Sequence, residues 1–341
     1  MNGQKTFVVI GSNCFTGSHV VDALLAKPGA RVIGVSRAAE SKALYLPYKG
    51  RAAASFEFRR LDLVTQMDKI LALLAEVKPA VIVNVAGLSE VGLSNESPVE
   101  YYETNTIAVA KLSDYLRRQP WLERYVHISS AEIFGSCSEP VTEAALFNPS
   151  TPYAVSKAAA DYHINTLIKN FGFRATLIRS TNVYGRHQQL FKIIPRTIIN
   201  VKLGRMIELH GGGISRKCFV HIRDVVDGMM LALERGGAGT YHLTEVSDLT
   251  VADVVKVTCE LMGRDFAACA RTVGERLGQD SQYVLDSGKA CRELGWAPRV
   301  KFTDGVRETI EWIEANWDAI SREPHIYIHR VSRTQSEAQH A

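Results

Sequence analysis

The sequence predicts an α/β protein built on a Rossmann-type, doubly wound parallel sheet, accompanied by a smaller mixed α/β lobe. Short apolar runs alternate with helical patterns through the first half of the chain, as is typical of parallel strands covered by helices on both faces. A glycine-containing turn joins the first strand to the first helix, which is a feature of dinucleotide-binding folds. After about Asn182 the alternation loosens, which indicates a second lobe.

The predicted elements follow one another without an internal repeat. Strands are expected over 6–10, 31–36, 56–61, 80–85, 125–129 and 175–179, and helices over 16–26, 67–76, 99–118 and 152–171. Later, short strands at 206–209, 240–243 and 283–286 mix with helices at 225–235, 251–262 and 304–317. We assign 1–181 mainly to the sheet domain and 182–330 mainly to the smaller, substrate-binding lobe, with the chain crossing between them. Residues 331–341 are polar and lack a pattern, which predicts a disordered tail.

Composition and charge exclude several classes of protein. The chain is 46% hydrophobic and 22% charged, and its net charge of +4 is scattered, so we expect no nucleic-acid partner. Six cysteines without a CxxC pair argue against a disulfide framework or a metal site. The sequence has no signal-peptide pattern and no apolar run that could span a bilayer. We therefore expect a cytoplasmic protein that has no membrane partner.

The turn after the first strand predicts a nicotinamide dinucleotide site. Gly11 allows a tight turn, and the N-terminus of the next helix offers free N–H groups to a pyrophosphate. Cys14 replaces the middle glycine of the common pattern, so the motif alone leaves an ordinary glycine turn as the alternative. The expected cofactor contacts in this turn are Gly11, Asn13, Cys14, Phe15, Thr16 and Gly17.

The residues after the second strand favour NADP over NAD. A carboxylate at this position would hold the ribose hydroxyls of NAD, but this chain has Ser36 and Arg37. A guanidinium suits a 2′-phosphate because it forms charge-assisted hydrogen bonds with phosphate oxygens. The alternative is that Arg37 is a solvated loop residue. Asp62 and Leu63 are placed to meet the adenine edge, although Asp62 would serve equally well as an N-cap.

Tyr153 and Lys157 form the predicted catalytic pair. Their spacing of four places both side chains on one face of a helix. A lysine ammonium stabilises a nearby phenolate, which lets the tyrosine act as a base, and the same lysine can bind the nicotinamide ribose. Ser130 follows the strand at 125–129, at the sheet edge where ligands bind in open α/β folds.

Together these motifs resemble the extended short-chain dehydrogenases/reductases, and within them the nucleotide-sugar epimerases and dehydratases. The motifs are nearest to those of the GDP-mannose and dTDP-glucose 4,6-dehydratases. The resemblance covers residues from about 5 to 320. It implies cofactor contacts from Val85, Ala86, Gly87 and Asn105 and substrate contacts from Ser130, Asn182, Arg216, Lys217 and Arg276. It also implies a nucleotide-diphosphate sugar as substrate, and a homodimer or higher homo-oligomer formed through the helices at 99–118 and 152–171.

Glu132 distinguishes among the reactions of this family. The resemblance implies that a glutamate here removes the C5 proton after oxidation at C4, which makes a 4,6-dehydratase the first hypothesis. The dTDP-glucose branch has an aspartate before this glutamate, whereas this chain has Ala131. Glu132 would then act as both base and acid, or a water would help.

Several alternatives remain open at this point. They are a 4-epimerase, an enzyme like UDP-glucuronate decarboxylase, and a cofactor-binding sensor without catalysis. For Glu132 itself, the alternative is a loop carboxylate that makes a structural salt bridge. Arg216 and Lys217 are adjacent basic residues, and either could make the diphosphate contact. The register of the family motif favours Lys217, whereas phosphate chemistry favours Arg216. The nucleotide base is not readable from the sequence.

Overall fold

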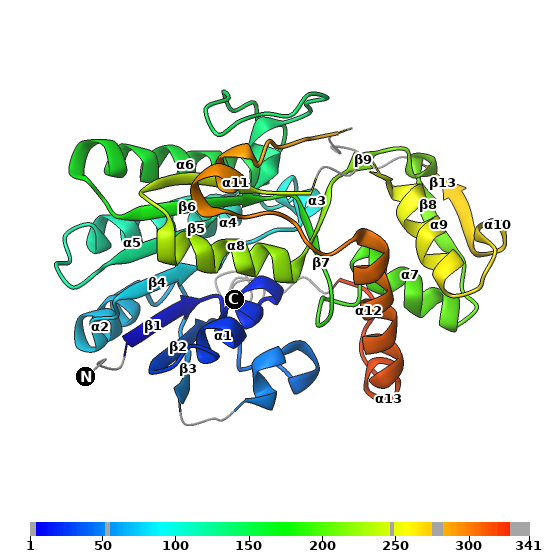
Figure 1. The fold of residues 1–341 in the computed structure, drawn as a ribbon, viewed down its shortest axis with the longest axis horizontal. Helices are drawn as coiled ribbons and strands as arrows, with labels where there is room; N and C mark the ends of the chain where they lie inside the picture. The colour runs from blue at the N-terminus through cyan, green and yellow to red at the C-terminus, as the bar shows by residue number, and fades with distance from the viewer. Residues whose placement is uncertain (1–4, 52–54, 246–248, 275–281, 328–341) are drawn as a thin grey trace, which may run out of the picture.

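The computed structural model describes residues 5–51, 55–245, 249–274 and 282–327 (Figure 1). Seven parallel strands form the central sheet in the order β11-β6-β5-β4-β1-β2-β3. The strands are β1 (Lys5–Ile10), β2 (Ala30–Ser36), β3 (Phe56–Arg60), β4 (Val81–Asn84), β5 (Arg124–Ile128), β6 (Ala175–Ser180) and β11 (Gly239–Leu243). The predicted Rossmann-type sheet is therefore confirmed.

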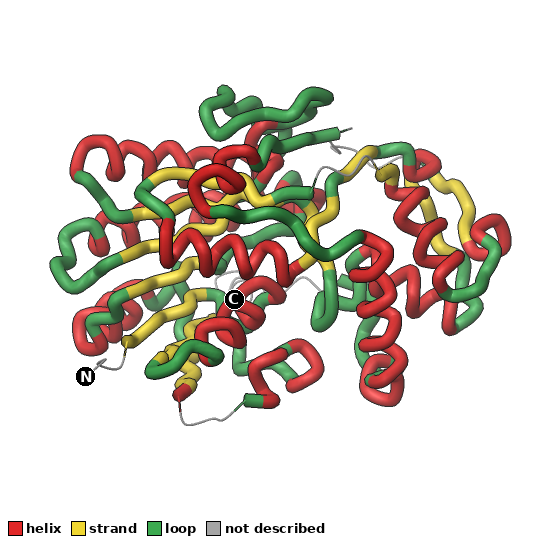
Figure 2. The backbone as a smooth tube through the Cα atoms, in the orientation of Figure 1, coloured by secondary structure: helices red, strands yellow, loops and turns green. Residues whose placement is uncertain are grey.

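Helices cover both faces of this sheet, as the tube in Figure 2 shows. One face packs against α1 (Phe15–Leu25), α8 (Ile222–Arg235) and α11 (Gly288–Leu294). The other packs against α2 (Met67–Val77), α5 (Ala108–Leu116) and α6 (Pro152–Phe171). The strands between them are almost fully buried, which explains why the sequence shows continuous apolar runs rather than alternation.

Helix α6 has strong local signals at both ends and forms over the predicted residues. The Thr151 side chain caps it by accepting a hydrogen bond from the Ala154 N–H at 3.2 Å, and Pro152 occupies the first turn. Gly172 ends the helix in the left-handed conformation with φ +63°. These caps fix where Tyr153 begins the helix.

Two expectations about elements are wrong in detail. The single helix predicted over 99–118 is divided into α4 (Pro98–Tyr102), the π-helical turn η4 (Glu103–Ile107) and α5. The strand predicted over 283–286 does not form, because only Leu285 makes an isolated bridge, to Val141. The short strand predicted over 240–243 forms as β11, which pairs with β6 in the central sheet.

The smaller lobe consists of helices and short strand pairs. Its helices are α7 (Ile193–Lys202), α9 (Val251–Leu261), α10 (Phe266–Cys269), α12 (Phe302–Ala315) and α13 (Trp317–Ile320). Its strands pair as β8 (Ile207–His210) with β13 (Ala270–Val273), and β9 (Arg216–Lys217) with β12 (Leu249–Thr250). Strand β7 (Asn182–Tyr184) pairs with β10 (Phe219–His221) beside the sheet domain, and α3 (Val91–Ser94) is a short helix after β4.

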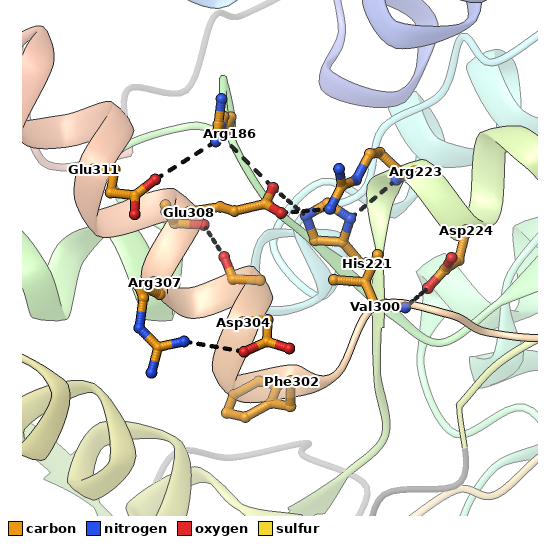
Figure 3. Close-up of polar contacts among 12 residues, drawn as sticks. Arg186, His221, Arg223, Asp224, Val300, Phe302, Asp304, Arg307, Glu308 and Glu311 are labelled. Atoms are coloured by element: carbon orange, nitrogen blue, oxygen red, sulfur yellow. Dashed lines mark hydrogen bonds and ion pairs between the residues drawn. The ribbon is translucent and has the colours of Figure 1, made fainter.

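A polar cluster fastens α12 to the start of α8 (Figure 3). Glu308 of α12 forms an ion pair with Arg223 and lies 3.8 Å from Arg186, which also lies 3.7 Å from Glu311. His221 Nε2 is 3.9 Å from Glu308, but burial lowers the pKa of His221 to about 3, so this imidazole is neutral. The cluster therefore depends on the guanidinium groups, and it sets where the chain after α12 returns toward the sheet.

Within the described residues, no helix is long and apolar enough to cross a membrane.

Candidate active site

The site lies where the strand order reverses, at the carboxyl ends of β1 and β4. Neighbouring crossovers leave the sheet in opposite directions there, which opens a crevice. Two adjoining clefts occupy it: the first has a volume of about 460 Å³ and the second about 310 Å³. Both clefts are lined by Cys14, Phe15, Val85, Gly87, Leu88 and Gln189.

The turn after β1 is packed too tightly for side chains at its glycines. A Cβ atom at Gly11, whose φ is +93°, would lie 2.6 Å from the Ala86 backbone nitrogen. A Cβ atom at Gly17 would lie 2.2 Å from the Gly11 carbonyl oxygen. The Cys14 thiol accepts a hydrogen bond from the Gly17 N–H at 3.2 Å, and burial raises the pKa of this thiol to about 11. A neutral cap and an exposed helix N-terminus fit a dinucleotide pyrophosphate.

The residues after β2 line the far end of the first cleft. The Ser36 hydroxyl accepts a hydrogen bond from the Asn13 backbone N–H at 3.0 Å, and the Asn13 amide donates to the Ala39 carbonyl at 2.8 Å. Arg37 is exposed and lines the cleft, while Arg60 Nε donates to the Arg37 carbonyl at 3.2 Å. Arg37 therefore stands where NAD sites typically have a carboxylate, and the carboxylates of Asp62 and Glu323 line the same cleft.

Asp62 and Leu63 also line the first cleft, and Asp62 has a local structural role as well. Its Oδ1 atom accepts hydrogen bonds from the Val64 and Thr65 N–H groups at 2.8 and 3.1 Å. The carboxylate therefore stabilises the turn that it belongs to. Its backbone is engaged as well, because the Asp62 N–H donates to Gln66 Oε1 at 3.0 Å and the Asp62 carbonyl accepts from the Gln66 N–H at 2.9 Å.

Asn105 lies behind the cleft wall rather than in it. Its Oδ1 accepts from the Leu88 N–H at 2.9 Å, and its Nδ2 donates to the Leu88 carbonyl and to the Ser156 hydroxyl, both at 3.0 Å. The π-helical turn η4 brings this buried amide toward the loop after β4, as π turns often do near functional sites. Asn105 thus holds Gly87 and Leu88 in place.

Ser130, Glu132 and Tyr153 line the second cleft together. Ser130 ends the β5 segment and caps η5 (Ala131–Phe134), because its hydroxyl accepts a hydrogen bond from the Glu132 N–H at 3.2 Å. Burial raises the pKa of Tyr153 above its ordinary value, the Glu132 charge adds to that rise, and a hydrogen bond from Ser130 opposes it. The phenol is therefore protonated unless a cation assists it.

Lys157 lies one helical turn away from Tyr153 and lines the same cleft. Its side chain is only 5% exposed, and its Nζ donates to the Ile128 carbonyl at 2.5 Å and lies 3.4 Å from His127 Nε2. Burial lowers the pKa of Lys157 to about 8, and the Asp161 carboxylate opposes that shift. The ammonium is thus poised to gain or lose a proton near neutral pH.

A buried polar chain that we did not predict supports Lys157 from behind. His127 Nδ1 lies 3.4 Å from the Tyr125 hydroxyl, which accepts from Asn84 Nδ2 at 3.1 Å. Burial, and then the Lys157 charge, lower the pKa of His127 well below its ordinary value, so the ring is neutral. The sequence feature that could have indicated this chain is the pair Tyr125 and His127, two polar residues at alternate positions of a buried strand.

A second buried cluster holds the η5 segment that carries Glu132. Arg179 Nε forms a fully buried ion pair with Asp161 Oδ2 at 2.9 Å. The Arg179 guanidinium also lies 5.2 Å from the Phe134 ring centroid and 4.8 Å from that of Phe147. Asp161 therefore links the cluster around η5 to Lys157, because its carboxylate pairs with Arg179 and also favours the charged form of Lys157.

The predicted substrate residues are divided by the structure. Asn182 lines the second cleft and donates to the Tyr283 hydroxyl at 3.1 Å, and Lys217 Nζ lies 4.5 Å from the Tyr283 ring centroid. Arg216 is instead exposed and pairs in register with Thr250, the N-cap of α9, in the β9–β12 ladder. Arg276 lies outside the described residues, as does the predicted tail at 331–341.

Lys192 is a cleft residue that the sequence motifs did not identify. It precedes α7, lines the second cleft, and pairs with Glu90 Oε1 at 2.5 Å. Tyr283 was missed for the same reason. Each lies outside the quoted motifs and is brought to the site only by the tertiary fold.

Comparison with known proteins places this geometry in a family. A family model described as GDP-mannose 4,6 dehydratase matches residues 8–309. The chain belongs to that family. The predicted resemblance to nucleotide-sugar dehydratases and epimerases is thereby confirmed.

Individual members of the family give the same result. The dTDP-glucose 4,6-dehydratase of Mycobacterium tuberculosis is 32% identical over 259 residues, which are 74% of this chain and 77% of that protein. The solved structure of DesIV, a dTDP-glucose 4,6-dehydratase from Streptomyces venezuelae with NAD bound, superposes with a TM-score of 0.84 at 30% identity and covers 92% of this chain and 98% of its own. A UDP-glucose 4-epimerase from Thermotoga maritima has a TM-score of 0.83 at 22% identity, which shows the shared fold alone.

We expect the Lys157 ammonium of this family member to titrate near pH 8 rather than at its ordinary value of 10.5, because burial penalises the charge. NMR titration of protein labelled with ¹³C at lysine Cε would measure this, with the signal assigned by its loss in Lys157→Arg. Replacing His127 with leucine removes a hydrogen-bond acceptor and should lower the pKa further. A Lys157 signal that titrates at its ordinary value would contradict this electrostatic interpretation.

Proposed function

We propose that the protein is an NADP(H)-dependent nucleotide-sugar 4,6-dehydratase, which converts a nucleotide-diphosphate hexose into the 4-keto-6-deoxy sugar. The observation that carries this proposal is Glu132, which lines the same cleft as Ser130, Tyr153 and Lys157. An oxidation set alone would serve an epimerase equally well. A carboxylate beside it adds the proton transfer that dehydration requires.

Oxidation at C4 is the first task of the site. Tyr153 accepts the proton of the C4 hydroxyl, Ser130 hydrogen-bonds to the same oxygen, and the Lys157 ammonium stabilises the phenolate. A nicotinamide bound in the first cleft would supply the acceptor for the C4 hydride and the donor of the hydride that C6 receives. Its pyrophosphate would lie on the N-terminus of α1, beside the turn of Gly11.

Elimination at C5 and C6 is the second task, and we assign it to Glu132. The C4 ketone acidifies the C5 proton, which the carboxylate removes while the C6 hydroxyl leaves as water. Ala131 is apolar and 1% exposed, so it cannot provide the proton for this leaving group. Glu132 therefore returns to the C6 oxygen the proton that it took from C5, so that water leaves. After hydride return to C6, a proton from solvent reaches C5 through Glu132, and Tyr153 releases to solvent the proton that it took from the C4 hydroxyl.

The sugar diphosphate is expected on the smaller-lobe side of the second cleft. Asn182 and Tyr283 offer hydrogen-bonding groups there, and Lys217 and Lys192 supply positive charge. Arg216, which pairs in register with Thr250 at the start of α9, is the weaker candidate of the basic pair, and Arg276 remains a candidate from the sequence alone. The relatives named dTDP-glucose 4,6-dehydratase support the reaction class. We do not assign the nucleotide base.

The dehydratase proposal predicts a specific loss in Glu132→Gln. On a panel of GDP-mannose, dTDP-glucose and UDP-sugars, the wild-type protein should release a product one water lighter than its donor. The variant should lose roughly 100-fold or more in kcat, because a positioned acid–base group contributes about that factor. Mass spectrometry of the products measures both effects.

Glu139→Gln is the matched control, because Glu139 is an exposed carboxylate in the segment after η5 and does not line the cleft. Its kcat should stay near the wild-type value. A product of unchanged mass together with full turnover by Glu132→Gln would instead establish the 4-epimerase alternative. Loss of carbon dioxide from a UDP-glucuronate donor would establish the decarboxylase alternative.

The preference for NADP rests on the basic end of the first cleft. Arg37 lines that end, and the three residues directly after β2, 37–39, carry no carboxylate that would repel a 2′-phosphate. The solved relatives contain NAD, so this preference is a departure from them. We expect NADP to bind more tightly than NAD by roughly ten-fold, the effect of one good charge-assisted contact.

Arg37→Ala should remove that preference and leave NAD affinity nearly unchanged, as measured by titration calorimetry with both cofactors. Arg59→Ala provides the control, because Arg59 is an exposed arginine on the same edge of the sheet that does not line the first cleft. Equal affinity of the wild-type protein for the two cofactors would refute the preference.

We also propose a homodimer formed by the α4–α5 and α6 helices. Apolar side chains on these helices are exposed in the single chain, with Val99 at 63%, Ile107 at 50% and Tyr162 at 54%. Covering these apolar side chains in an interface would remove apolar surface from water. Light scattering that gives the mass of one chain would contradict this proposal.

A further inference from the structure

The chain after α13 returns to the sheet domain and borders the first cleft. We call residues 321–327 the C-terminal segment. Glu323, Pro324, Ile326 and Tyr327 from this segment line the cleft together with Ser36 and Arg37. The family match ends at residue 309, so this wall lies outside the part of the chain that the family model covers.

One end of the segment is fixed to the loop that follows β2. Glu323 forms an ion pair with Lys42, and the Tyr45 hydroxyl hydrogen-bonds to the same carboxylate. The Glu323 side chain is 13% exposed, whereas that of Lys42 is 72% exposed, so the glutamate is held in the wall and the lysine reaches it from solvent. Tyr45, in the short helix η1 (Ala43–Tyr45), also lines the cleft.

The other end of the segment contacts the loop that leads into the smaller lobe. The Tyr327 ring packs edge-on against Phe191, with 5.1 Å between their centroids, and Phe191 lines the first cleft as well. His325 Nε2 lies 2.9 Å from the Ile320 carbonyl, which turns the chain after α13. The segment therefore crosses from the loop after β2 to the loop before α7.

The side chains that face the cleft are suited to an apolar ring with a charged group nearby. Ile326 is 73% exposed and Tyr327 is 37% exposed, although both line the cleft. Burial raises the pKa of Tyr327, Glu90 adds to that rise, and the nearby Arg37 guanidinium opposes it, which places the hydroxyl near the basic end. Covering these side chains with a planar base would remove apolar surface from water.

We propose that the C-terminal segment is a part of the cofactor site, in which Ile326 and Tyr327 pack against the adenosine half of the dinucleotide while Glu323 anchors the segment through Lys42 and Tyr45. This inference rests on the proposed nicotinamide cofactor. It adds cofactor-contacting residues that come from neither the glycine turn nor the strand ends. It also couples adenosine binding to the position of the smaller lobe through Phe191.

Two truncations of the full chain test the proposal. Ending the chain after Tyr327 removes 328–341 and keeps the segment, whereas ending it after Arg322 also removes residues 323–327, which include every residue of the segment that lines the cleft. We expect the longer form to bind NADP within about two-fold of the full chain. The shorter form should bind at least roughly ten-fold more weakly, mainly through faster release, as lost contacts at a site usually act on the dissociation rate. Stopped-flow fluorescence and calorimetry with NADP and NAD provide the constants.

Point variants in the full chain guard against loss of folding. Ile326→Ser and Tyr327→Ala should each weaken cofactor binding while leaving the cofactor-free melting temperature unchanged. Ser321→Ala should do neither, because Ser321 is exposed and its hydroxyl bonds to the Asp318 carbonyl. Tight binding by the shorter truncation, or equal weakening by both truncations, would overturn the proposal.

The result is distinguishable from failure of the proposed function. A full chain that binds neither NAD nor NADP would overturn both proposals. A full chain that binds cofactor with the shorter truncation unaffected overturns only the role of the segment. Neither conclusion depends on dehydratase turnover, because the experiment measures cofactor binding alone.

Discussion

The buried ammonium of Lys157 is the constraint on which the rest of the site depends. A lysine that is 5% exposed needs partners, and this one has the Ile128 carbonyl, His127 and the charge of Asp161. Each partner comes from a different part of the buried scaffold: the end of β5, its interior, and the helix that carries Lys157 itself. The parallel sheet is therefore more than a platform, because its strand β5 supplies two of the groups that contact this buried lysine.

Asp161 extends this constraint to Glu132. The same carboxylate that favours the Lys157 charge pairs with Arg179, whose guanidinium packs on the aromatic rings around η5. A buried pair of this kind is costly to break, because the remaining charge would be left without a partner. The oxidation residues and the residue assigned to elimination are thus mounted on one connected buried cluster, which keeps their relative positions fixed between the two steps.

Much of the fold was predictable because its signals are local. Helix α6 has a threonine cap, an early proline and a terminal glycine, so its bounds could be read directly. The π-helical turn at Asn105 has no such signal, since its register is set by hydrogen bonds to Leu88 and Ser156 from other elements. The segment at 283–286 looked like a strand because it is apolar, but it is buried against the second cleft and not paired along its length.

The residues of the site also differ in whether the sequence alone could predict them. Ser130, Tyr153 and Lys157 stand at fixed spacings in motifs, whereas Lys192 and the C-terminal segment reach the clefts only through long-range packing. Arg216 and Lys217 show most clearly what the sequence alone cannot predict. They are adjacent in sequence, so their side chains leave strand β9 on opposite faces. Lys217 lies beside Tyr283, whereas Arg216 pairs in register with Thr250 at the start of α9.

The central claim is that one cleft oxidises C4 and then eliminates water across C5 and C6. Its most direct test is a donor sugar labelled with deuterium at C4, with the position of the label in the product located by NMR. The account predicts a product that has lost one water and has deuterium at C6. Deuterium that stays at C4, in a product of unchanged mass, would contradict it.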